Sequence, residues 1–220
     1  MPRRTAIPVY IESGARRVFA AAVEWPGWCR AAKTEGQALE ALSAYAPRYA
    51  PVATRAGIAL PEPFEVRVTE RVPGTPTTDF GAPDRVLDSD TRALGPKELE
   101  RLLSLLRAAW AVLDDVAAAA PATLRKGPRG GGRDRDRDRM IEHVLGAEQA
   151  YARKLGLRHP QARVGDRAGI DALRRDISDR CRSIATSGGA TPWPVRYFIR
   201  RTAWHACDHL WEMEDRSVVA

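Results

Sequence analysis

Three of the four histidines in this chain stand in two segments with helical periodicity. His205 and His209 are four residues apart near the C-terminus, and His143 lies in an earlier segment. A helix advances about 100° per residue, so residues i and i+4 share one face about 5–6 Å apart. Two imidazoles at that spacing can bind one cation, and a third from a neighbouring helix completes a three-histidine face with open coordination positions. The spacing therefore predicts a divalent-metal site.

Two charged residues stand close to the histidine pair. Arg201 is one helical turn before His205 and is a candidate for binding an anionic group of a substrate. Glu212 follows His209 by three residues and is a candidate hydrogen-bond acceptor for that imidazole, an extra ligand or a base. Ala206 stands where an HExxH metalloprotease has its glutamate, so that mechanism has no support.

Small residues share the face of His143. One of them is a glycine, which destabilises a helix by about 1 kcal/mol relative to alanine. We interpret these small side chains as leaving room beside His143 for another helix or a ligand. The residues are Gly146, Ala147 and Ala150. The alternative interpretation is an ordinary amphipathic helix with packed histidines and no metal.

The remaining histidine and the cysteines favour other roles. His159 precedes a proline, and we expect it in a loop. Cys207 lies on the opposite side of its helix from the histidine pair, and we expect it to be a packed thiol. Three cysteines, Cys29, Cys181 and Cys207, cannot all pair with one another and form no CxxC motif. We therefore expect reduced thiols in the cytoplasm.

Residues 1–72 have the pattern of a small α+β module. Two runs rich in β-forming residues, 7–13 and 17–27, are joined at Ser13-Gly14 and predict a hairpin, with a further short strand at 28–34. Residues 63–72 alternate apolar and polar side chains and return to strand. The predicted order is β-β-α-β.

The helix of this module is predicted to begin after Thr34. Thr34 and Gln37 have the spacing of a capping box, and apolar residues follow at helical intervals. Pro47 and Pro51 are expected to break that helix.

The rest of the chain changes character twice. Residues 73–96 are dense in Pro, Gly, Asp and Thr and predict a linker or irregular surface. Four amphipathic segments, 96–120, 140–157, 169–185 and 193–216, predict a four-helix bundle over 97–220. In the third segment the predicted inward residues are Ile170, Leu173, Ile177, Cys181 and Ile184. The predicted fold class is an α+β module followed by an all-α bundle.

The charge distribution and the hydropathy of the chain argue against nucleic acid and membranes as partners. The formal net charge is +7, and the excess lies in residues 91–220. The run "RKGPRGGGRDRDRDR" at 125–139 contains aspartates that repel phosphates, so nucleic acid is not an expected partner. No apolar run approaches the roughly 18–20 residues of a membrane span, so a membrane is not expected either.

The two histidine segments together, "MIEHVLGAEQAYARKLG" at 140–156 and "RRTAWHACDHLWEMEDRS" at 200–217, resemble the DinB-like family of bacterial metal-binding four-helix bundles. The resemblance covers roughly residues 97–216. It implies that His143, His205 and His209 match the family's three-histidine metal site. Family members include enzymes that use low-molecular-weight thiols for transfer or isomerisation, and many others have no assigned reaction. Residues 19–42 resemble, more faintly, HicB-type antitoxin folds, with no recognisable DNA-binding element beside them.

Two functions are compatible with these observations. The first is a metalloenzyme for a small-molecule substrate, with Zn or Ni as the first choice of metal and Fe or Mn as alternatives. In the thiol-dependent version, a low-molecular-weight thiol is a cosubstrate, and Arg201 and Glu212 are the candidate catalytic residues. The second is a regulatory or partner-binding protein with a structural metal. The N-terminal module is interpreted as an accessory or dimer-forming unit, so a homodimer is one expected assembly.

Overall fold

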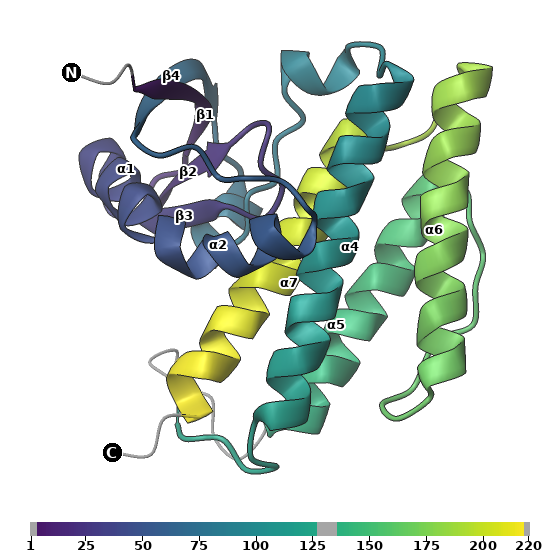
Figure 1. The fold of residues 1–220 in the computed structure, drawn as a ribbon. Helices are drawn as coiled ribbons and strands as arrows, with labels where there is room; N and C mark the ends of the chain where they lie inside the picture. Colours follow the sequence, from purple (N-terminus) through teal and green to yellow (C-terminus); the bar gives the residue numbers. More distant parts are fainter. Residues whose placement is uncertain (1–3, 127–135, 218–220) are drawn as a thin grey trace.

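A computed structural model describes residues 4–126 and 136–217 (Figure 1). A four-stranded sheet with helices forms the N-terminal part, and four long helices form the C-terminal part. The fold is therefore α+β, as the sequence predicts. No helix within the described residues has the length and apolar character needed to cross a membrane.

The sheet has the strand order β3-β2-β1-β4. β1 (Thr5–Ser13) and β2 (Val18–Ala22) form the predicted antiparallel hairpin, and β3 (Cys29–Ala32) is the predicted further strand. β4 (Phe64–Pro73) pairs with β1 in the parallel direction. Helices α1 and α2 provide the crossover that a parallel pair requires.

The helix predicted after Thr34 ends before Pro47, as expected. α1 (Glu35–Ala44) begins at the Thr34 cap, and a second helix, α2 (Ala46–Arg55), follows after a single residue. Pro47 lies in the first turn of α2, where its missing N–H has no helical acceptor. Pro51 lies inside α2, which nevertheless buries Tyr49 and Val52. The expected break is therefore confirmed near Pro47, whereas Pro51 does not end α2.

The segment predicted as a linker or irregular surface, 73–96, packs along the sheet. It contains α3 (Pro76–Phe80) and a 3₁₀ turn, η1 (Asp88–Thr91). The buried carboxylate of Glu12 on β1 accepts hydrogen bonds from the Thr78 hydroxyl at 2.5 Å and from the backbone N–H groups of Asp84 at 2.8 Å and Arg85 at 3.1 Å. These bonds fix the segment beside the C-terminal helices.

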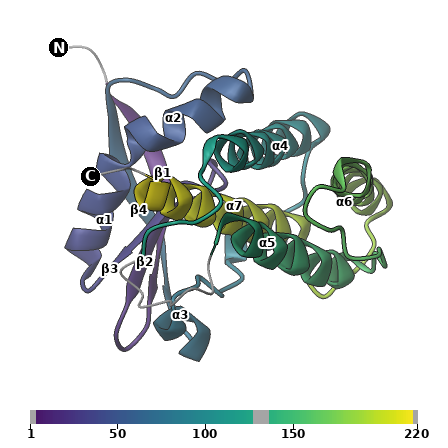
Figure 2. The same cartoon turned by 90° about the horizontal axis from the view of Figure 1, so that it is seen from below.

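The four long helices pack against one another (Figure 2). They are α4 (Pro96–Ala119), α5 (Arg137–Ala152), α6 (Arg167–Ser187) and α7 (Val195–Ser217), with a 3₁₀ turn, η2 (Arg153–Leu155), after α5. The five residues predicted to face inward on α6 are all buried. Residues 127–135, most of the basic–acidic run, lie outside the described residues.

The two parts of the chain share one hydrophobic core. Trp28 and Tyr49 from the N-terminal part belong to the same buried cluster as α4 and α7 residues. The contact is close at Gly27, whose φ is 98° and whose added Cβ would lie 2.6 Å from the Cys207 sulfur. Only glycine fits this turn without strain. α7, which carries two of the histidines, is therefore held by the sheet part as well as by its neighbouring helices.

Candidate metal centre

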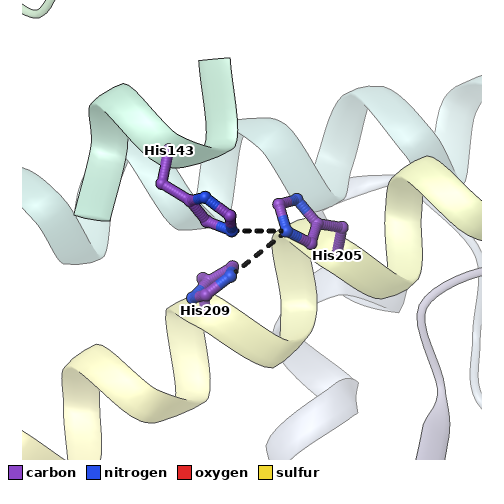
Figure 3. Close-up of side chains that lie close together, drawn as sticks. All are labelled: His143, His205 and His209. Atoms are coloured by element: carbon purple, nitrogen blue, oxygen red, sulfur yellow. Dashed lines mark hydrogen bonds between the residues drawn. The ribbon is translucent and has the colours of Figure 1, made fainter. Parts of the chain in front are cut away.

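The structure brings together the three histidines that the sequence predicts (Figure 3). His143 projects from α5, and His205 and His209 project from successive turns of α7. The Nε2 atom of His205 lies 3.1 Å from Nε2 of His143 and 3.2 Å from Nε2 of His209. All three rings therefore point the same kind of nitrogen into one small space.

Hydrogen bonding alone does not satisfy this arrangement. The Nε2 atom of a neutral imidazole carries either one proton or one lone pair, so it makes one hydrogen bond in the ring plane. His205 Nε2 has two nitrogen neighbours at hydrogen-bond distance. When only the three side chains are present, His205 Nε2 can therefore form a good hydrogen bond with one of these two nitrogens but not with both. A cation between the nitrogens would accept all three lone pairs at once.

The separations fit such a cation. Zinc–nitrogen bonds are about 2.0–2.1 Å long, and two ligands at a tetrahedral angle are then about 3.3 Å apart. The two measured Nε2–Nε2 separations, 3.1 and 3.2 Å, are close to this value. The donor set of three imidazoles suits zinc, nickel, iron and manganese.

Burial makes the site asymmetric. The side chains of His205 and His209 are buried, with 7% and 5% of their surface exposed, whereas His143 is exposed. Burial lowers the pKa of His205 well below its usual value, and the neighbouring His209, His143 and Arg201 lower it further. The imidazole of His205 is therefore neutral, which is the form that binds metal. Open coordination positions would lie on the side of His143.

Glu212 lies on the far side of His209 from the cluster. Its Oε2 atom is 3.5 Å from His209 Nδ1, and its Oε1 atom accepts a hydrogen bond from Arg216 at 3.1 Å. A carboxylate beside Nδ1 favours the tautomer with its proton there, which leaves the Nε2 lone pair for the cluster. Glu212 therefore lies beside an imidazole, and its role in orienting His209 stays a prediction.

Arg201 is buried beside the cluster. Its Nη1 atom donates to the carbonyl of Pro83 at 2.6 Å, and its guanidinium carbon lies 4.7 Å from the centre of the Trp204 ring. The Trp204 ring is 5.8 Å from the His205 ring. Arg201 is therefore separated from the imidazoles by about one side chain.

An aromatic wall beside the histidines was not predicted. Tyr151 on α5 lies 5.9 Å from the His205 ring and 5.1 Å from the Trp193 ring, measured between centroids. The only sequence signal was its spacing, because Tyr151 follows His143 by eight residues and falls near the same helical face.

The small residues near His143 have a different neighbour from the one expected. A Cβ added to Gly146 would lie 3.4 Å from the Gln161 side-chain nitrogen, so the loop after α5 approaches there instead of another helix. Ala147 is half-buried and Ala150 is exposed. Of the two alternatives for this space, a loop residue stands where a helix was one expectation, and room for a ligand stays a prediction.

The other candidate residues lie outside the cluster. Cys207 is buried, as expected, against the turn at Gly27, and burial raises the pKa of its thiol. His159 lies in the loop between η2 and α6, and its Nε2 atom is 3.6 Å from Oδ2 of Asp176. Asp208 forms an ion pair with Arg30 of β3 at 3.7 Å.

Comparison of the chain with protein-family models, with curated proteins and with solved structures finds no match in any of the three.

Proposed function

We propose that this chain binds one divalent metal ion through His143, His205 and His209, and that it is a DinB-like metalloenzyme acting on a small molecule. The observation that carries the proposal is the convergence of three imidazoles from two helices, with ligand atoms all within 4.8 Å of one another and two Nε2–Nε2 separations close to those of a tetrahedral metal site. The resemblance of the same two histidine segments to the DinB-like family is its second support. A thiol-dependent transferase or isomerase is the reaction class that this resemblance implies.

The side chains around the cluster suit a reactive site more than a purely structural one. Structural zinc sites are closed by four protein ligands, whereas the described residues group only three here. When bound, a divalent ion lowers the pKa of a water or thiol that shares its open positions. The exposure of His143 gives such a molecule access from solvent.

The protein side chains would each have a separate task. His209 presents its Nε2 lone pair because Glu212 stands beside Nδ1. Buried Arg201 supplies positive charge beside the cluster. The Trp204 and Tyr151 rings limit water on two sides of His205.

Metal analysis of protein purified without a metal-binding tag tests the site. We expect one ion per chain in the wild type and a large loss of occupancy in His143→Ala, His205→Ala and His209→Ala. His159→Ala is the matched control, because it removes the one histidine outside the cluster and should keep full occupancy. Wild-type protein that stays metal-free after incubation with Zn²⁺ or Ni²⁺ would exclude the site.

Turnover assays then test the enzyme half of the proposal. Metal-loaded protein is tested for conjugation or isomerisation of small electrophiles with low-molecular-weight thiols, and His205→Ala should lose that activity. Full metal occupancy without turnover, together with co-purification of one stoichiometric protein partner, would favour a structural metal in a partner-binding protein.

A further inference from the structure

Arg201 carries a buried charge without a carboxylate partner. Only 8% of its surface is exposed. Among the residues that the structure describes, no carboxylate lies within salt-bridge distance of its guanidinium, and its buried Nε has no hydrogen-bond partner. Within the described residues, its Nη1 donates a hydrogen bond to the carbonyl of Pro83. Unpaired buried charges are expensive, so this guanidinium requires an explanation.

The preceding residue, Arg200, allows a comparison with a buried arginine that has a carboxylate partner. Arg200 is buried to a similar extent, with 5% exposed, but it forms an ion pair with the buried carboxylate of Asp90. It also donates to the Tyr10 hydroxyl at 2.6 Å and to the carbonyl of Arg85 at 3.1 Å. The Nε atoms of both arginines lack a hydrogen-bond partner. The two differ in charge pairing, because Arg200 has a carboxylate partner and Arg201 has none within the described residues, where its guanidinium contacts the Tyr151 and Trp204 rings.

The position of that charge points toward the histidine cluster. Arg201 and His205 are one helical turn apart on α7, and both lie against the Trp204 and Tyr151 rings. On the other side, between α7 and the sheet, the cavity that Arg201 lines has a volume of about 10 Å³, which is room for about one water. That cavity is too small for a carboxylate ligand, so the remaining direction to consider is the side of the histidines.

The local charges also favour an anion. Glu212, the carboxylate nearest to His209, is already paired with Arg216. Asp208 is paired with Arg30 on the sheet side. A divalent ion in the cluster and the charge of Arg201 would therefore add to a strongly positive site, and a bound cation of this kind is often the largest local charge.

We infer that the site takes a small molecule that carries a carboxylate, which pairs with Arg201 while a second donor atom of the same molecule reaches the metal held by the three histidines. This inference rests on the proposed metal site and names its substrate class. A guanidinium accepts a carboxylate through two parallel N–H donors, so the pairing also fixes the orientation of the molecule.

A matched pair of thiols tests this inference. Both probes, 3-mercaptopropionate and its neutral amide 3-mercaptopropionamide, offer the same sulfur to the metal and differ only in the carboxylate. Co²⁺-loaded protein is titrated with each, and binding is followed by the visible absorption of the cobalt. We expect the wild type to bind the carboxylate probe at least tenfold more tightly than the amide, because a charge-assisted pair replaces a neutral contact.

Variants assign the preference to Arg201. In Arg201→Gln the preference should fall to about one, while Co²⁺ affinity and amide binding stay within about twofold of wild type. Arg196→Gln is the control, because it removes the same charge from α7 at a residue paired with Glu98. It should keep the preference. If Arg201→Gln does not fold, Arg201→Lys replaces it and should show a reduced preference, because lysine keeps the charge but loses the two-donor geometry.

The outcomes separate this inference from the metal site. A preference that persists in Arg201→Gln would show that the carboxylate binds elsewhere, such as on the metal itself, and would overturn the inference. Equal binding of the two probes by the wild type would also overturn it, with the metal site intact. A wild type that binds no Co²⁺ would remove the proposed function and this inference together.

Discussion

Replacement of His205 by alanine should remove the stabilisation that metal gives to the fold. A ligand that binds only the folded state at a free concentration of 100 times its Kd stabilises that state by about 2.7 kcal/mol. For a chain of 220 residues, each kcal/mol added to the free energy of unfolding raises the melting temperature by about 2–4 °C. We therefore expect Zn²⁺ at that concentration to raise the melting temperature of the wild type by about 5–11 °C.

The informative quantity is the difference between metal-loaded and metal-free protein. His205 is buried, so His205→Ala also leaves a cavity, but that cost enters both measurements and cancels. In His205→Ala the metal-dependent shift should vanish, whereas in His159→Ala it should remain. Differential scanning calorimetry with and without Zn²⁺ measures both values. A shift in His205→Ala equal to that of the wild type would refute the assignment of His205 as a ligand.

Three further predictions concern the elements that support the site. Glu212→Gln should weaken metal affinity by about 10- to 100-fold without removing a ligand, measured by competition with a chromophoric chelator, because the proton on His209 Nδ1 loses its carboxylate. Gly27→Ala should destabilise the fold by about 1–3 kcal/mol in urea unfolding, because its φ is 98° and the added Cβ meets the Cys207 sulfur at 2.6 Å. Burial raises the pKa of the Cys181 thiol from 9.0 to about 12. Its stabilising contribution is therefore complete below pH 9.0, the unfolded value, and falls as the pH rises toward 12, by up to about 1.4 kcal/mol per pH unit in urea unfolding.

Each of these predictions has an outcome that contradicts it. Unchanged affinity in Glu212→Gln would mean that the carboxylate does not orient His209. If Gly27→Ala is as stable as the wild type, or if a Cys207→Ala background relieves none of its cost, the close contact does not form as described. A Cys181→Ala variant with the same loss of stability between pH 9 and 10 as the wild type would assign that loss to other groups.

The sequence was most informative where a local pattern determines local structure. The inward face of α6 follows from its 3.6-residue period, and the hairpin follows from the turn at Gly14. The break expected near Pro47 is observed, but Pro51 lies inside α2. That helix buries Tyr49 and Val52, and no local rule includes such a tertiary contact. The order in segment 73–96 depends on Glu12, more than sixty residues earlier, and composition carries no such information.

In the candidate site, too, local spacing could be predicted from the sequence, whereas tertiary contacts could not. The i, i+4 spacing of His205 and His209 could be read directly, and His143 could be added once α5 was expected to lie beside α7. Sequence also identified Arg201 as a candidate for binding an anion. It could not show that Arg200 has a carboxylate partner and that Arg201 has none in the part of the chain that the structure describes, because that difference depends on where Asp90 and Pro83 lie in the folded chain.

The most direct test of the central claim is X-ray absorption spectroscopy at the zinc edge of protein loaded with one equivalent of Zn²⁺. A three-histidine site predicts a first coordination shell of nitrogen and oxygen at about 2.0–2.1 Å, with the multiple-scattering signal of three imidazoles. In His143→Ala, that signal should fall to two imidazoles. A shell with sulfur from a cysteine at about 2.3 Å, or one without imidazole scattering, would contradict the three-histidine site.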